Sequence, residues 1–372
     1  DRLSDAGDLW TYGYGLNWSP AKAIDLVASV THEEGAPTLE QLGGPTLVTP
    51  NLRSFDFVRR EVVDLARVTG GNPGLANDDR RLVRLGTTLR PLAKTDFSIS
   101  VDYVRSRTDN PIARFPILTS QIETAFPERF ARDATGRLQR IDARAINFAQ
   151  ARQQQLRWGI NFSRPLGKVP EFLRDARVKV VTSEAEARRL FPNAEMIRAA
   201  PGSATALGAA NLTSRLYFSL YHNWYLEDDI SLRRGGPRLD LLDGGAVDFL
   251  GGRRRHEVDF QAGAFKGGWG ARISANWRSG TSVRDPGQPA SDLRFDDYAI
   301  ANINLFANLS EAIGGTSPPK WLKGTRASLA VSNLFNIRPR VRDAAGTVPL
   351  SYQPAYFDPL GRVISLGLRK MI

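Results

Sequence analysis

The chain has 372 residues, no cysteine and a formal net charge of +11. The lack of cysteine excludes a disulfide framework and thiolate metal sites. No run of about 18 apolar residues occurs, which excludes a transmembrane helix but not a membrane β-barrel, where only alternate residues need to be apolar. The basic charge is typical of a nucleic-acid or anionic-surface partner, and equally of a pore lined with arginine.

The first predicted strand covers residues 9–18, where five large apolar side chains alternate with small or polar ones: Trp10, Tyr12, Tyr14, Leu16 and Trp18. A period of two predicts a β-strand with two unlike faces. A ring-rich face with tryptophan at both ends is typical of contact with lipid. A soluble sandwich or barrel with an aromatic core is the alternative, but the opposite face suits a wet lumen.

The same alternation recurs along the chain and predicts about eleven strands, at residues 9–18, 24–31, 81–90, 96–104, 154–163, 214–225, 256–264, 270–278, 302–309, 326–335 and 364–369. A length of about 9 to 12 residues is what a tilted strand needs to cross a bilayer. We therefore predict an all-β fold, a transmembrane antiparallel β-barrel. Its predicted lipid-facing girdle comprises Trp10, Tyr12, Tyr14, Trp18, Trp158, Trp224 and Trp277.

The connections alternate between short turns, such as "LRPLAKTD", and long segments at about 33–79, 106–150, 230–254, 279–295 and 337–361. This asymmetry is typical of outer-membrane barrels with long extracellular loops. Residues 165–210 are long on the short-turn side and are predicted to be a periplasmic insertion with a helix capped by Ser183 and Glu186. If "RVKVV" within them is a spanning strand, the topology shifts by one. Ser120 and Glu123 predict another helix, within 106–150.

Three stretches carry a family resemblance. "GGNPGLANDDRR" (residues 70–81) resembles the G-N-P segment before a barrel strand of TonB-dependent outer-membrane receptors, with Asp78 in place of the usual Glu. "SLAVSNLFNIRPR" (328–340) resembles the penultimate strand of that family. The tail "LSYQPAYFDPLGRVISLGLRKMI" is similar to its last loop and strand, although Ile372 replaces the usual final aromatic residue.

The resemblance implies a barrel of 22 strands, an N-terminal plug domain and a TonB box. We find about half of the strands, and neither plug nor box. An odd number of strands cannot close an antiparallel ring, and lipid disfavours unpaired strand edges. We therefore predict that residues 1–372 are the C-terminal part of a receptor barrel. The N-terminal plug and the remaining strands would come from a separate or cleaved chain.

Catalytic and metal sites are not predicted. His32, His222 and His256 are scattered along the sequence, and a metal site needs converging ligands. The acidic pairs Glu33–Glu34, Asp78–Asp79 and Asp228–Asp229 are adjacent residues, which face opposite ways on a strand. We predict no cofactor, no enzymatic activity and no nucleic-acid partner.

The inward-facing arginines are the main candidate site, and they are Arg84, Arg157, Arg215, Arg272 and Arg326. They favour an anionic substrate such as a ferric chelate or an acidic saccharide, or else they pair with acidic residues of the plug. Tyr352, Tyr356 and Phe357 either stack on a sugar or chelator or pack within their loop. The run Arg253, Arg254 and Arg255 predicts contact with lipopolysaccharide phosphates, or is a solvated loop end.

The predicted function is that of an outer-membrane receptor of a Gram-negative bacterium. By resemblance, the complete protein binds a scarce solute at its extracellular loops and imports it with energy from TonB–ExbB–ExbD. A barrel half that scaffolds a surface lipoprotein or complex is the first alternative, and a passive porin is the second. A plug with a TonB box in the partner chain would distinguish transport from both.

Overall fold

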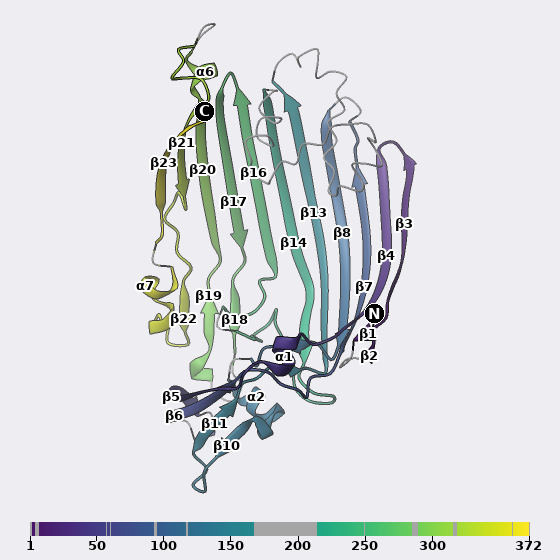
Figure 1. Cartoon of the computed structure of the whole chain (residues 1–372), viewed down its shortest axis with the longest axis vertical. Helices are drawn as coiled ribbons and strands as arrows, with labels where there is room; N and C mark the ends of the chain where they lie inside the picture. Colours follow the sequence, from purple (N-terminus) through teal and green to yellow (C-terminus); the bar gives the residue numbers. More distant parts are fainter. Residues whose placement is uncertain are drawn as a thin grey trace.

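The computed structural model describes residues 2–3, 7–56, 58–59, 61–92, 95–116, 118–166, 214–248, 250–284, 289–314, 318–358 and 360–371. One large sheet dominates, and all eleven predicted strands lie in it, each antiparallel to its neighbours (Figure 1). The strands are β3 (Thr11–Ala21), β4 (Ile24–Gly35), β7 (Asp78–Leu89), β8 (Asp96–Asp109), β13 (Gln150–Pro165), β14 (Arg215–Ser231), β16 (His256–Lys266), β17 (Trp269–Arg278), β20 (Tyr298–Asn308), β21 (Thr325–Ser332) and β23 (Val363–Lys370).

The cross-strand register gives this sheet two chemically different faces. Gly86, Asp102 and Arg157 are direct partners across β7, β8 and β13, so they share one face. The next row, Leu85, Tyr103 and Leu156, lies on the other face. We call these the polar face and the apolar face. The alternation holds in the middle part of the strands, where a register slip of one residue would move the apolar side chains onto the polar face.

The two ends of the sheet differ in the length of their connections. The turns after β3, β7 and β16 are at the upper end of Figure 1, which we call the turn end, together with the C-terminus and α6 (Leu309–Ala312). The loops at 36–77, 110–149, 232–255, 279–297 and 333–362 are at the lower end, the loop end. The predicted alternation is confirmed for these connections. The predicted insertion at 165–210, with its Ser183–Glu186 helix, lies almost wholly outside the described residues.

The edge strands of the sheet are β3 and β23, and among the described residues neither has a ladder partner on its outer side. With eleven antiparallel strands, both run from the loop end to the turn end. All of the residues of β3 and β23 are exposed. The described sheet is therefore open, as the odd strand count predicts.

None of the helices in the described part of the chain is long and apolar enough to span a membrane.

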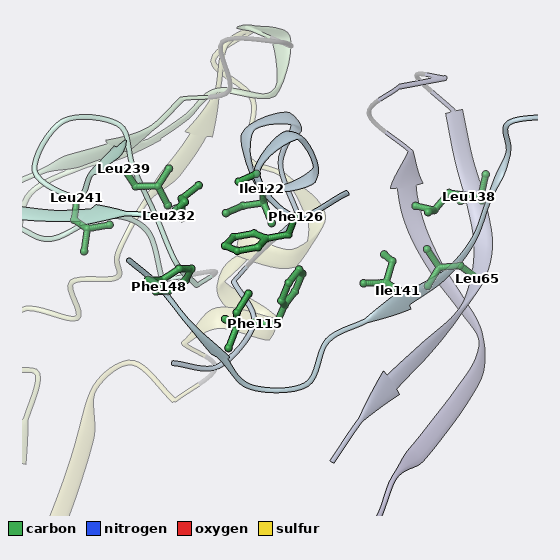
Figure 2. Packing of buried hydrophobic residues seen from close by; sticks show 13 residues of the cluster. Leu65, Phe115, Ile122, Phe126, Leu138, Ile141, Phe148, Leu232, Leu239 and Leu241 are labelled. Atoms are coloured by element: carbon green, nitrogen blue, oxygen red, sulfur yellow. The ribbon is translucent and has the colours of Figure 1, made fainter. Parts of the chain in front are cut away.

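Three loops fold together into a unit that we call the loop-end cluster (residues 36–77, 110–149 and 232–241). It contains a four-stranded sheet of β5 (Leu47–Asp56), β6 (Glu61–Thr69), β11 (Leu138–Asp142) and β10 (Phe130–Arg132), in which β6 and β11 are parallel. Its core is fully apolar and includes Leu65, Ile122, Phe126, Phe148 and Leu232 (Figure 2). The helix predicted from Ser120 is present as α2 (Ser120–Ala125), but the cap is Thr119, whose hydroxyl accepts a hydrogen bond from the Ile122 backbone N–H.

A buried network of charged side chains links the strands of the four-stranded sheet in the loop-end cluster. Asp56 is fully buried and accepts hydrogen bonds from the Arg132 guanidinium at 2.7 and 2.9 Å. The Leu138 backbone N–H donates to the same carboxylate at 3.2 Å, and Arg132 also contacts Glu123. Burial raises the pKa of Asp56, but the hydrogen bonds from Arg132 and the backbone outweigh it and lower the pKa to about 2.

The remaining elements are short and lie mostly in the loops. The strands β18 (Thr281–Val283), β19 (Leu293–Phe295) and β22 (Val341–Asp343) form a small sheet over a core of Phe295, Val341 and Tyr352. The others are β1 (Arg2–Leu3), β2 (Gly7–Asp8), α1 (Leu39–Gly43), β9 (Ile112–Ala113), β12 (Ile146–Asn147), β15 (Arg238–Asp240), α7 (Pro354–Phe357) and three 3-10 turns, Pro127–Arg129, Pro289–Ser291 and Leu350–Tyr352.

The "SNLFN" motif ends β21 in a tight turn. Asn333 has a positive φ of 52°, its side chain donates to the Ile337 carbonyl at 2.7 Å, and its Oδ1 accepts from the Ile337 N–H at 2.9 Å. Asparagine tolerates this left-handed conformation because its short polar side chain hydrogen-bonds locally. The motif therefore has a structural role here, and Phe335, expected on the strand, lies in this turn and is exposed.

Candidate functional site

The candidate site is the polar face of the sheet together with its loop end. All five predicted inward arginines lie on this face, and each has a partner within it. Two of them pair with carboxylates. Arg84 donates two hydrogen bonds, at 2.8 and 3.2 Å, to the same oxygen of Asp102, and Arg215 donates to Asp96 at 2.8 Å.

The other three arginines contact aromatic rings instead. The Arg157 guanidinium carbon lies 4.4 Å from the centre of the Tyr221 ring, and that of Arg326 lies 4.0 Å from the centre of the Phe306 ring. Arg272 donates to the Tyr217 hydroxyl at 3.0 Å. Among the described residues, no carboxylate forms an ion pair with Arg157, Arg272 or Arg326. Their positive charges are therefore available on the polar face.

Glycine makes room for each of these rings on the wall. A Cβ added at Gly159 would lie 2.2 Å from the Tyr221 ring, one at Gly263 would lie 2.6 Å from the Tyr217 hydroxyl, and one at Gly270 would lie 2.1 Å from the Phe306 ring. In each case the ring lies over the glycine backbone, in the space that a side chain at that position would otherwise occupy. The glycines of the alternating pattern thus fix the aromatic rings that in turn position three arginines.

At the loop end, the polar face contains a cavity of about 470 Å³. Its lining comes from five adjacent strands and includes Glu33, Arg80, Ser106, Gln153 and Asp228. Asp228 is buried and accepts hydrogen bonds from Gln153 at 3.1 Å and from Arg253 at 2.8 Å. Its sequence neighbour Asp229 faces the other way and pairs with Arg238 at 2.6 Å, as expected for adjacent strand residues.

The three arginines predicted to contact lipopolysaccharide, Arg253, Arg254 and Arg255, lie in the loop that precedes β16. Arg253 is held by Asp228 and lies over the Tyr225 ring, and Arg254 donates to the Ser279 carbonyl at 2.6 Å beside the Tyr298 ring. Burial disfavours the charge of both; it lowers the pKa of Arg254, whereas the hydrogen bond and charge of Asp228 prevail at Arg253 and raise its pKa. Arg255 is exposed.

A second cavity, of about 810 Å³, lies among the loops near β18, β19 and β22. Three arginines line it. Arg284 pairs with Asp243 at 2.6 Å and Arg342 with Asp296 at 3.4 Å, while Arg294 lies directly across from Arg342 in the sheet. Of the two predicted loop tyrosines, Tyr352 is buried against Phe295 and Phe357, so it packs within the loop, and Tyr356 is exposed.

The predicted girdle residues all lie on the apolar face or at its border. Trp158 and Trp224 flank His222 and His256, two histidines that are far apart in the sequence. The Trp158 indole N–H donates to His222 at 2.9 Å, and the His222 and His256 rings stack 5.3 Å apart with their nitrogens 3.1 Å from each other. Leu220, His222 and Trp224 occupy every second position of the strand, and this spacing indicates that His222 lies on the apolar face. The described residues contain no group of three or more side chains arranged to hold a metal ion.

Comparison with known proteins identifies this architecture. No family model and no curated protein matches the chain. A mutant of the ferric enterobactin receptor PfeA from Pseudomonas aeruginosa matches it with a TM-score of 0.53 at 14% identity, over 98% of this chain and 40% of that receptor. The siderophore receptor PirA from Acinetobacter baumannii matches with a TM-score of 0.54 at 13% identity, over 98% of this chain and 41% of that receptor.

The fold is therefore that of a transmembrane receptor barrel. More narrowly, it is the antiparallel β-barrel fold of TonB-dependent siderophore receptors, as the sequence motifs predict. The chain spans about two fifths of the length of these receptors.

Proposed function

We propose that this chain forms part of the barrel wall of an outer-membrane receptor that imports an anionic solute with energy from TonB. The first support is the fold, which it shares with receptors named for ferric enterobactin and for siderophores. The second is the contrast between the two faces, since aromatic and aliphatic side chains on one suit lipid and polar side chains on the other suit a channel. The long loops would then be extracellular.

The proposal of an anionic solute rests on three arginines of the polar face, Arg157, Arg272 and Arg326. Their guanidinium groups are positioned by aromatic rings and not neutralised by carboxylates of the described wall. A charged group in a confined channel needs a counter-charge, which either a passing anion or the plug supplies. A ferric siderophore is the first substrate to test, and an acidic saccharide is the second.

The edges of the sheet define the partners that the proposal requires. Backbone N–H and C=O groups facing lipid must be hydrogen-bonded, because each unsatisfied group costs several kcal/mol. The outer edges of β3 and β23 therefore need further strands, and these would belong to the part of the receptor that also provides the plug and the TonB box. We assign the chain no catalytic role.

The test is uptake of ferric enterobactin labelled with radioactive iron by cells that carry the complete receptor. The variant R157Q/R272Q/R326Q should reduce uptake at least tenfold at an unchanged level of receptor in the outer membrane. The matched control is R84Q/D102N, which removes a guanidinium from the same face without changing the net charge, and it should transport normally.

Two outcomes would contradict the proposal. Unchanged uptake of every anionic solute tested in the triple variant, with loss of the plug on purification, would assign these arginines to plug contacts instead. Uptake that persists in cells without TonB would indicate a passive porin, and the absence of any transported solute would favour a scaffolding role for a surface lipoprotein.

A further inference from the structure

The cavity at the loop end of the polar face is built from two rows of side chains. The register aligns one residue from each of five neighbouring strands in the first row, and these are Thr31, Leu82, Ser106, Gln153 and Asp228. The second row, two residues nearer the loops, contains Glu33, Arg80, Thr108 and Ala151. Both rows line the cavity, whose volume of about 470 Å³ is in the range of small-molecule sites.

Three hydroxyl groups line this cavity without a partner in the described part of the chain. Thr108 is only 7% exposed, and its hydroxyl forms no side-chain hydrogen bond there; nor do those of Thr31 and Ser106. Buried polar groups normally have a hydrogen-bond partner, and a hydroxyl can both donate and accept. The cavity therefore suits a ligand that itself has hydroxyl groups.

Planar polar groups lie beside these hydroxyls. Asp228 is buried and is held by hydrogen bonds from Gln153 at 3.1 Å and from Arg253 at 2.8 Å. Arg80 lies directly across from Thr108 in the sheet. Carboxylate, amide and guanidinium groups each present two polar atoms side by side, so they can pair with neighbouring hydroxyls of a sugar ring. None of the described lining residues is aromatic, so the cavity offers no ring on which an aromatic chelator could stack.

The charges around the cavity do not favour an anion. Three carboxylates lie around it, those of Glu33, Asp78 and Asp228. Two guanidinium groups oppose them, those of Arg80 and Arg253. Because the carboxylates are in excess, an anionic group gains no attraction here, whereas neutral hydroxyl groups find both donors and acceptors. The cavity is therefore a site for a neutral, hydroxylated group.

An anion site lies within reach of the cavity on the same face. Arg157 is four residues from Gln153 along β13, which is about 13 Å, and it forms no ion pair with a carboxylate of the described residues. A single solute can occupy both places if its acid group lies about that far from a neutral, hydroxylated group. An oligosaccharide that joins one acidic sugar to neutral sugars has this form.

We propose that the loop-end cavity binds a neutral sugar ring of an acidic oligosaccharide whose carboxylate pairs with Arg157. The inference rests on the proposed import of an anionic solute and names the class of that solute, a saccharide and not an aromatic iron chelator. Asp228 then accepts hydrogen bonds from the sugar, Arg80 donates them, and Thr108 does both.

The experiment measures binding of the complete receptor to an array of acidic and neutral oligosaccharides that includes aldotetrauronic acid. The receptor is kept in a zwitterionic detergent, because maltoside detergents have sugar headgroups. The wild type should bind an acidic oligosaccharide, and S106A/T108V should bind it about tenfold more weakly, because two hydrogen-bonding hydroxyls are lost. The matched control T88V/S100A loses the same groups from directly paired residues outside the cavity and should bind as the wild type does.

A further comparison tests the acidic end of the solute. The R157Q variant should bind the acidic oligosaccharide more weakly than the wild type does, and so should the wild type when the sugar carboxylate is reduced to an alcohol. The two changes together should cause no greater loss than either alone, because they remove the two partners of one ion pair.

Thermal unfolding in the same detergent detects a variant that misfolds. Without ligand, S106A/T108V and T88V/S100A should both unfold at the temperature of the wild type. The bound oligosaccharide should raise the unfolding temperature of the wild type and of T88V/S100A, and leave that of S106A/T108V unchanged.

Two results would overturn the inference, namely that no acidic oligosaccharide binds, or that S106A/T108V binds as well as the wild type. The proposed function is tested separately. If ferric enterobactin is imported through Arg157, Arg272 and Arg326 while no saccharide binds, that function stands and only the solute class is wrong. Binding of the oligosaccharide without any TonB-dependent import would have the opposite meaning.

Discussion

The spanning sheet and the loop-end cluster are stabilised in opposite ways. In the loop-end cluster, Phe126, Phe148 and Leu232 are removed from water, and the Asp56–Arg132 pair is buried with them. In the sheet, Tyr14, Leu366 and Leu368 of the edge strands remain more than two-thirds exposed in the isolated chain, and Leu16 and Ile364 remain more than half exposed. The loops therefore have their own core, whereas the apolar face of the sheet is left uncovered by the described chain.

The largest expected effect is on the buried ion pair. Asp56→Asn removes the charge that compensates Arg132, and breaking a buried pair from one side typically costs about 3 kcal/mol or more. Hydrogen exchange should show β5, β6, β10 and β11 losing protection while β13 and β14 keep theirs. Equal loss in the sheet strands would show that the two regions unfold as one unit and would remove the contrast.

Acid should weaken the loop-end cluster through the same carboxylate. The folded pKa of Asp56 is about 2, below its ordinary value of 3.8, so its stabilisation is present above pH 4 and is lost as the pH falls towards 2. The loss is about 2 kcal/mol. Cleavage by pepsin within 36–77 should rise between pH 4.5 and pH 2.5 in the wild type.

Asp133 titrates in the same range, since hydrogen bonds from Thr135 and the Arg137 backbone lower its pKa to about 2. The Asp56→Asn variant separates the two carboxylates. It should be cleaved readily at both pH values, whereas an Asp133→Asn variant should keep the pH dependence of the wild type. A flat pH profile in the wild type would contradict the role of Asp56.

In the sheet, crowding should matter more than charge. Gly159→Ala places a methyl group where the Tyr221 ring lies and should destabilise the complete receptor in detergent by about 1–3 kcal/mol. Gly15→Ala is the matched control, because the nearest atoms to its new Cβ are 3.8 Å away. Thermal unfolding of the two variants measures the difference, and the double variant with Tyr221→Ser should recover the loss. Equal unfolding temperatures would show that the ring moves freely.

The smallest effect is expected for the exposed pair on the wall. Asp102→Asn should change the free energy of unfolding by less than about 1 kcal/mol, because half of the Arg84 side chain is exposed and water screens the pair. Thermal unfolding in detergent measures this change. If Asp102→Asn cost as much free energy of unfolding as Asp56→Asn, the polar face would have to exclude water as fully as the core of the loop-end cluster does.

Alternation along single strands was enough to predict the sheet, its two faces and the difference between its ends. The long loops were less accessible. Residues 47–69 form two strands that pair with each other, but β6 also pairs in parallel with β11, about 70 residues later in the chain, and a parallel pair so distant has no local signal. The same limit applies to the site. Alternation shows that Arg157 and Tyr221 both lie on the polar face, but only the pairing of β13 with β14 shows that they are neighbours.

The parallel pairing of β6 with β11 has a mechanical consequence. Arg140, Ile141 and Asp142 align with residues 66–68, and the core beneath them also takes in Leu239 from the 232–241 segment. Residues from three separate loops are thereby held together in one folded unit. A ligand or antibody that displaces any one of these loops must therefore displace the other two with it.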